Sequence, residues 1–111
     1  MDIDQYQEQA AQTAIYPGKD SIAGLTYTAL GLAGEAGEIS NKVKKILRDD
    51  NGVVTNEKRQ DLIGELGDVL WYVAMVAEEI DWDLSSIANI NLTKLKSRQH
   101  RGVLSGSGDN R

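Results

Sequence analysis

The chain carries one short acidic pattern twice, and this duplication limits its fold more than any other feature. The first copy, Gly-Glu-Ala-Gly-Glu-Ile, occupies residues 34–39, and the second, Gly-Glu-Leu-Gly-Asp-Val, occupies residues 64–69. Residues three apart lie on one face of an α-helix, so each copy would present two carboxylates beside an apolar stripe. The expected stripes consist of Leu32, Ala36, Ile39, Val43 and Ile46 in the first helix and of Leu62, Leu66, Val69, Val73, Val76 and Ile80 in the second.

If the two stripes pack together, four carboxylates border one groove: Glu35, Glu38, Glu65 and Asp68. Four anions in one groove would repel and raise one another's pKa, and a divalent cation would remove that cost. Ligands that offer only oxygen suit Mg²⁺ or Mn²⁺. One acidic pair beside an apolar stripe is usually a solvated helix edge, but two matched copies favour a shared metal site.

The same pattern places four glycines inside helices, namely Gly34, Gly37, Gly64 and Gly67. A glycine in a helix interior costs about 1 kcal/mol relative to alanine. We interpret these positions as points of close helix approach, not as ligand contacts.

Composition excludes several classes of site. A chain of 111 residues is one domain. It has no cysteine, which excludes disulfides and zinc-thiolate sites, and its single histidine excludes a Glu-x-x-His di-iron site. A net charge of -5 argues against a polymeric nucleic-acid partner, but not against a small phosphorylated ligand held through a metal. With neither a leader-like segment nor a long apolar run, we expect a cytoplasmic protein without membrane contact.

Hydrophobic periodicity predicts an all-α chain of four helices. They should span residues 2 to about 15, about 25–47, 56–80 and 84 to about 98, with Thr55 or Asn56 capping the third and Asp83 the fourth. The third helix is apolar over a wide arc, which indicates a central helix or a subunit interface. On the same grounds, Trp71 and Tyr72 are expected in the core or an interface.

Cations follow the acids along the chain. Lys94 and Arg98 lie one turn apart in the fourth helix, beside Asn91. A cationic pair together with an acidic metal site suits a polyphosphate, because the metal and the cations share its oxygens. Lys42 and Lys45 lie on the acidic side of the second helix, where each either reaches a phosphate or forms an ordinary surface ion pair.

The last segment, residues 103–111, is polar and rich in glycine and serine. Such composition is typical of a mobile chain end. This segment, together with His100 and Arg101, either closes over a ligand as a lid or stays free of it.

These motifs resemble a known family. Glu35-x-x-Glu38 followed by Glu65-x-x-Asp68 is similar to the metal-binding signature of the all-α nucleoside triphosphate pyrophosphohydrolases, in particular the MazG-like branch. Residues 31–38, 65–72 and 91–98 fit the same pattern, and the likeness covers about residues 5 to 102. We therefore expect a MazG-like domain over 1–102 and a tail over 103–111. One departure is Gly34, where many relatives carry a further Glu, which leaves the number of metals open.

The resemblance implies a four-helix bundle that assembles as a dimer or a dimer of dimers. It also implies Mg²⁺-dependent hydrolysis of nucleoside triphosphates, including (d)NTPs, to the monophosphate and pyrophosphate. By the resemblance, the metal ligands are Glu35, Glu38, Glu65 and Asp68, and the triphosphate ligands are Asn91, Lys94 and Arg98.

A mechanism can be stated as a hypothesis. Glu38, in preference to Glu35, acts as base or orients a metal-activated water that attacks the α-phosphorus. Lys94 and Arg98 then stabilise the departing pyrophosphate. Two alternatives remain: a relative that acts on dUTP or phosphoribosyl-ATP, and a non-catalytic helical interaction module. The preferred base and sugar are left open.

Overall fold

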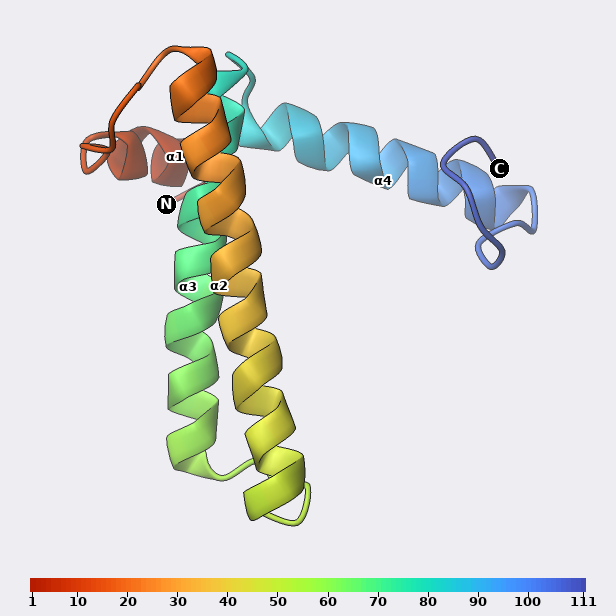
Figure 1. Ribbon diagram of the computed structural model, residues 1–111. Coiled ribbons are helices and arrows are strands. Elements are labelled where there is room, and N and C mark those ends of the chain that lie inside the picture. Colours follow the sequence, from red (N-terminus) through yellow and green to blue (C-terminus); the bar gives the residue numbers. More distant parts are fainter.

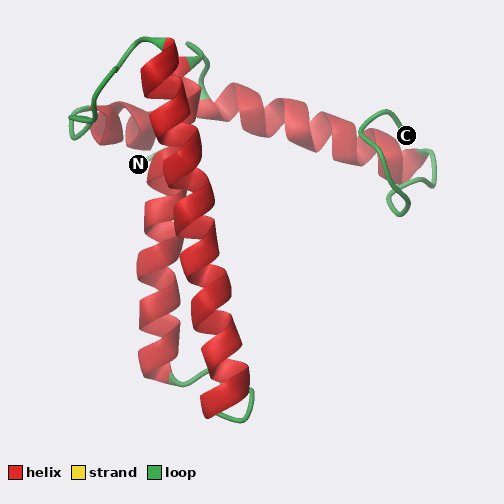
Figure 2. Cartoon of the chain, in the orientation of Figure 1, coloured by secondary structure: helices red, strands yellow, loops and turns green.

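The computed structural model describes all 111 residues and contains helices and connecting turns but no strands (Figure 2). The four helices are α1 (Ile3–Ala11), α2 (Ile22–Asp49), α3 (Asn56–Glu79) and α4 (Leu84–His100). These elements confirm the expected all-α class and the expected number of helices. None of the four has both the length and the apolar character that a membrane crossing needs.

The helices are arranged as a hairpin with two shorter arms (Figure 1). α2 and α3 lie side by side along most of their length, and α1 and α4 meet at the open end of this hairpin. The rest of α4 projects away from the hairpin. The radius of gyration is 16.9 Å, against about 13 Å for a compact chain of this size. A single chain therefore does not close a bundle.

Side-chain caps explain where the two long helices begin. The hydroxyl of Ser21 accepts a hydrogen bond from the Ala23 amide, and that of Thr55 accepts one from the Lys58 amide. Thr55 thus caps α3 as expected. The Ser21 cap explains why α2 begins before the predicted start near Leu25.

The first helix is shorter than the sequence pattern predicts. α1 ends at Ala11, not near residue 15, because the amide and hydroxyl of Thr13 both donate to the Ala10 carbonyl and close a tight turn. The connector then returns to the core at Tyr16, whose buried hydroxyl donates to Glu79 at the end of α3. Burial and this hydrogen bond raise the pKa of Tyr16 above its usual value.

The fourth helix is capped from another helix. Asp83 precedes α4 as expected, but its side chain makes no capping hydrogen bond, so that prediction was wrong in its chemistry. The carboxylate of Asp4 in α1 instead accepts from the Ser85 amide at 2.9 Å and from the Ser85 hydroxyl. The hydroxyl and amide contacts lower the pKa of Asp4. α1 thereby supplies the anion that the N-terminus of α4 favours.

One buried amide joins three helices at the same corner. Gln7 is 4% exposed. Its Nε2 donates to Glu78 Oε1 at 3.0 Å and to the Trp82 carbonyl at 2.9 Å, and its Oε1 accepts from the Leu84 amide at 2.8 Å. These contacts connect α1 to the end of α3 and the start of α4.

The core is small and lies at this corner. Its buried apolar side chains are Ala10, Tyr16, Ala74, Met75, Ala77 and Leu84. Only 11 of the 111 residues are buried, which is few for a chain that must stand alone. Large apolar side chains stay exposed along the three longer helices, among them Leu30, Leu47, Ile63, Leu66, Leu70, Ile90 and Leu95.

The glycines at which helices approach closely are not those of the repeated pattern. Added methyl groups at Gly34, Gly37, Gly64 and Gly67 would meet nothing within 4 Å, so within the single chain the prediction of close helix approach at these four positions was wrong. The close approach is at Gly31, where a methyl group would overlap the ring of Tyr72. Only glycine lets that ring lie against the backbone of α2.

We predict that Gln7→Ala destabilises the fold by roughly 2–4 kcal/mol, because it leaves the Leu84 amide and the Trp82 carbonyl without partners. Urea unfolding followed by circular dichroism measures the loss. Gln9→Ala, at an exposed position of the same helix, is the matched control and should change stability little. Equal stability of the two variants would show that the Gln7 contacts do not hold the corner.

Candidate metal centre and adjoining cavity

Three of the four predicted carboxylates meet in the seam between α2 and α3. Glu35 comes from α2, and Glu65 and Asp68 come from α3; one oxygen of each lies within 4.8 Å of the others. Glu65 and Asp68 share a helix face because they are three residues apart. The antiparallel packing of α2 against α3 then brings Glu35 to the same point.

Without a cation, the negative charges of this cluster are only partly compensated. The Oε2 atom of Glu65 is buried and has no hydrogen-bond partner. Desolvation, a hydrogen bond with Glu65, and the charges of Asp68, Glu65 and Glu38 raise the pKa of Glu35. A partnerless buried oxygen beside two further carboxylates fits a hard divalent cation such as Mg²⁺ or Mn²⁺.

The fourth predicted ligand, Glu38, lies outside this group of three. It is exposed on α2, one turn beyond Glu35, and its charge contributes to the raised pKa of Glu35. Its role as a ligand or base therefore stays a prediction.

The two lysines of α2 differ in their surroundings. Lys42 Nζ lies 3.3 Å from Glu65 Oε1, and both side chains are largely covered. Lys42 was expected either to reach a phosphate or to form a surface ion pair. The structure shows the ion pair, which joins α2 to a carboxylate of the cluster on α3. Lys45 is exposed and forms no ion pair.

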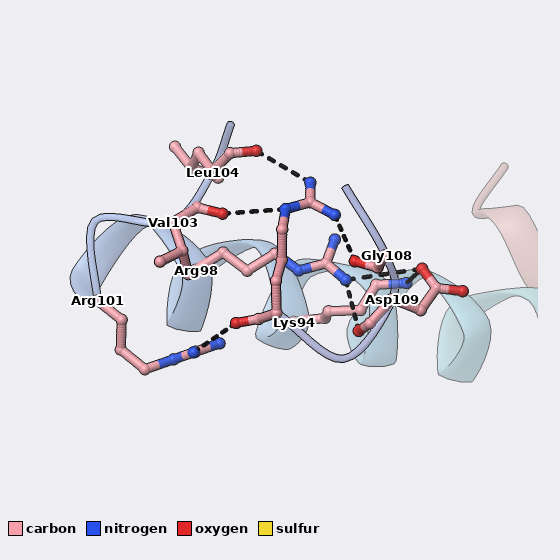
Figure 3. A network of polar contacts seen from close by, with 8 residues as sticks. Lys94, Arg98, Arg101, Val103, Leu104, Gly108 and Asp109 are labelled. Carbon is pink, nitrogen blue, oxygen red and sulfur yellow. Dashed lines mark hydrogen bonds and ion pairs between the residues drawn. The ribbon is translucent and has the colours of Figure 1, made fainter. Parts of the chain in front are cut away.

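The predicted phosphate ligands do not reach the cluster within one chain. Asn91, Lys94, Arg98 and the neighbouring Arg101 all belong to the arm that leaves the hairpin (Figure 1). Lys94 lies about 15 Å along α4 from its start, and Asp68 lies about 17 Å back along α3 from its end. Arg98 is buried, but under residues 103–111, not in the seam (Figure 3).

A cavity of about 380 Å³ opens beside the cluster. Its lining consists of Thr13, Glu35, Asp68, Trp71 and Tyr72. Trp71 packs against the core as expected, yet it and Tyr72 also line this cavity. Trp71 Nε1 donates to Thr13 Oγ1 at 2.8 Å, which fixes the indole. The sequence spacing is the signal that both aromatic residues line the cavity, because each follows Asp68 by about one helical turn.

Tyr72 is held between the helices. Its ring lies over Gly31 and meets the Trp71 ring edge-on, with 5.0 Å between centroids. Burial, then Tyr27, Glu35 and Asp68, raise its pKa. The phenol is therefore a neutral hydrogen-bond donor beside the carboxylates.

Carboxylates gathered from two adjacent helices beside a cavity suit a metal-dependent all-α phosphohydrolase. The comparisons define the family: the MazG nucleotide pyrophosphohydrolase domain matches residues 24–103, and the chain belongs to this family. Membership supports nucleotide pyrophosphohydrolase activity in general and implies a nucleotide substrate. The family is typically metal-dependent, in keeping with the acidic cluster.

One curated relative covers the whole chain. The chain is 60% identical over 114 residues to the "Gene 37 protein" of Mycobacterium phage L5, with 100% of both chains covered. That name states no activity. No solved structure matches the chain.

We predict that the metal-free protein loses stability as pH rises through the titration of Glu35. Its folded pKa lies above the ordinary value of 4.5, so between these two values the folded state binds more protons than the unfolded state, and the free energy of unfolding falls with pH. Thermal unfolding in EDTA at a series of pH values measures this slope. Glu35→Gln should flatten it, whereas Glu57→Gln at the far end of α3 should not. An unchanged slope in Glu35→Gln would contradict the assignment.

Proposed function

We propose that this protein hydrolyses nucleoside triphosphates, including (d)NTPs, to the monophosphate and pyrophosphate with Mg²⁺, for which Mn²⁺ can substitute. One observation carries the proposal: in a chain of the MazG family, Glu35, Glu65 and Asp68 converge within 4.8 Å. The partnerless buried oxygen of Glu65 supports a cation at this point.

The proposed mechanism divides the work among the chain's own residues. Glu35, Glu65 and Asp68 would hold the cation, which would supply positive charge to the phosphate oxygens and lower the pKa of the attacking water. Glu38, exposed one turn along α2, accepts the proton of that water, with attack at the α-phosphorus. Lys42, which pairs with Glu65 in the structure, would be able to contact a phosphate if the Glu65 carboxylate were engaged as a metal ligand.

The nucleoside fits the cavity beside the cluster. Trp71 and Tyr72 offer flat apolar surfaces, and Thr13 offers a polar atom. The volume of about 380 Å³ lies in the range of small-molecule sites. Which base this cavity prefers is a question for a substrate panel, and the same panel separates canonical nucleotides from dUTP and phosphoribosyl-ATP.

The proposal requires a second copy of the chain. Asn91, Lys94 and Arg98 lie on an arm that points away from the carboxylates of the same chain (Figure 1). The apolar side chains exposed along the hairpin and α4, such as Ile63 and Ile90, would be covered in a dimer or a dimer of dimers. The open glycines of the repeated pattern would let a partner helix approach. In such an assembly, α4 of one chain brings its cations to the hairpin of the other.

We predict that Glu65→Gln lowers kcat by at least 100-fold, because the mutation removes a charged ligand from the cluster. The assay combines purified protein, Mg²⁺ and each canonical (d)NTP, with chromatography of the products. Release of monophosphate and pyrophosphate together identifies the cleaved bond. Glu57→Gln, which removes a remote charge from the same helix, is the control and should keep wild-type activity. Absence of turnover with every nucleotide and no Mg²⁺-dependent thermal shift would favour the interaction module.

We predict that two inactive variants restore activity when they are refolded together. Glu65→Gln damages the acidic half of the site, and Lys94→Met damages the cationic half. If each site combines halves from two chains, half of the sites in a mixed dimer are intact, so an equal mixture should recover about a quarter of the wild-type rate. Recovery should vanish when both mutations are placed in one chain and mixed with either single variant. A mixture no more active than its components would mean that each chain builds its own site.

A further inference from the structure

The last nine residues form a closed loop on α4, although their composition is typical of a mobile end. The guanidinium of Arg111 makes three hydrogen bonds inside this segment, to the carbonyls of Val103, Leu104 and Gly108 at 3.1, 3.0 and 2.6 Å (Figure 3). Gly108 has a φ of 86°, a conformation that glycine adopts at little cost. Arg101 closes the loop by donating to the carbonyl of Arg111 at 2.6 Å. We call residues 103–111 the C-terminal loop.

This loop places a carboxylate on the cation pair of α4 (Figure 3). Arg98 Nη2 donates to the carbonyl of Asp109 at 2.8 Å. The Asp109 Oδ1 atom lies 3.6 Å from Arg98 Nη2 and 3.7 Å from Lys94 Nζ. Arg98 is 5% exposed, whereas the Asp109 side chain is 88% exposed. The loop is thus bonded firmly through its backbone, and its carboxylate rests loosely on both cations.

We propose that Asp109 is a built-in competitor for the anion that binds Lys94 and Arg98, so that phosphate must displace its carboxylate. The proposal rests on the proposed function, which assigns these two cations to the triphosphate. It concerns the regulation of that site, because an anionic ligand must interact with the two cations strongly enough to displace the Asp109 carboxylate.

The strength of the contacts supports displacement over permanent pairing. Although Arg98 is buried, the Asp109 carboxylate is largely exposed, so its ion pairs are weak at this separation, and neither distance is a hydrogen-bonding one. A polyphosphate offers several charged oxygens at once and makes stronger, charge-assisted hydrogen bonds. A singly charged ligand gains little by replacing one carboxylate with another anion. Asp109 therefore raises the free energy that any anion must supply at the cation pair, and a polyphosphate supplies it most readily.

The contacts of Arg111 that hold the C-terminal loop in place can be removed without changing Asp109 itself. Arg111 contacts only carbonyls of its own loop, so its guanidinium serves to fix the loop and is not presented to a ligand. Loss of the Arg111 side chain should release Asp109 from the cations. Simple electrostatics predicts the opposite, because removing a positive charge ought to weaken anion binding.

The experiment is calorimetric titration of the full chain with inorganic tripolyphosphate in EDTA at low ionic strength. Asp109→Asn should bind about two- to fivefold more tightly than the wild type, as expected for the loss of weak ion pairs made by an exposed carboxylate. Arg111→Gln should also bind more tightly, despite its lost charge. Lys94→Met should bind more weakly, both alone and combined with Asp109→Asn.

Two charge-matched controls accompany these variants. Asp61→Asn removes an exposed acid and Arg59→Gln an exposed base from the remote half of α3; the first should leave binding unchanged and the second should not strengthen it. Circular dichroism confirms that every variant is folded.

The outcomes separate this inference from the proposed function. Unchanged or weaker binding by Asp109→Asn, with Lys94→Met weakened, overturns the competitor role and leaves the phosphate site intact. Weaker binding by Arg111→Gln overturns the role of the loop as a frame. Tighter, Lys94-dependent binding by Asp109→Asn in a protein that hydrolyses no nucleotide supports the competitor and rejects the proposed activity.

Discussion

The pairing of α2 with α3 forces three carboxylates into one small volume, and the properties of the site follow from that constraint. Glu35, Glu65 and Asp68 would separate if each helix were free, but the hairpin holds them within 4.8 Å. Desolvation, together with the neighbouring carboxylates, raises the pKa of Glu35, and a buried Glu65 oxygen is left without a hydrogen-bond partner. Such a cluster stores electrostatic energy that only a proton or a cation can release. A divalent cation is the partner that also serves phosphate chemistry.

Much of this arrangement could be predicted from the sequence, because helical period and spacing are local properties. The repeated pattern identified the carboxylates, and the caps and turns located α2 and α3 to within a few residues. The relative placement of helices is not local: that Glu38 lies outside the group of three depends on how far one helix slides along the other. Gln7 and the Asp4–Ser85 cap were missed for the same reason, since their partners lie more than 70 residues away along the chain.

The carboxylate cluster and the Lys94–Arg98 pair lie on separate arms of the molecule. The hairpin carries the carboxylates and the aromatic cavity, whereas α4 carries Lys94 and Arg98, and the corner around Gln7 joins the two. A small core and long exposed apolar faces suit a chain that completes its site in an assembly. In the chain as it stands, the one carboxylate of Asp109 lies 3.6 and 3.7 Å from the two cations of α4, and Lys42 pairs with Glu65 of the acidic cluster, so each half of the proposed site has part of its charge compensated.

The most direct measurement of the central claim is anomalous diffraction from crystals of the protein grown with Mn²⁺. The account predicts an anomalous peak coordinated by carboxylate oxygens of Glu35, Glu65 and Asp68, with Lys42 moved off Glu65. A structure at saturating Mn²⁺ with no peak in that seam, or with Mn²⁺ only in the second acidic cavity around Asp4 and Glu8, would contradict it.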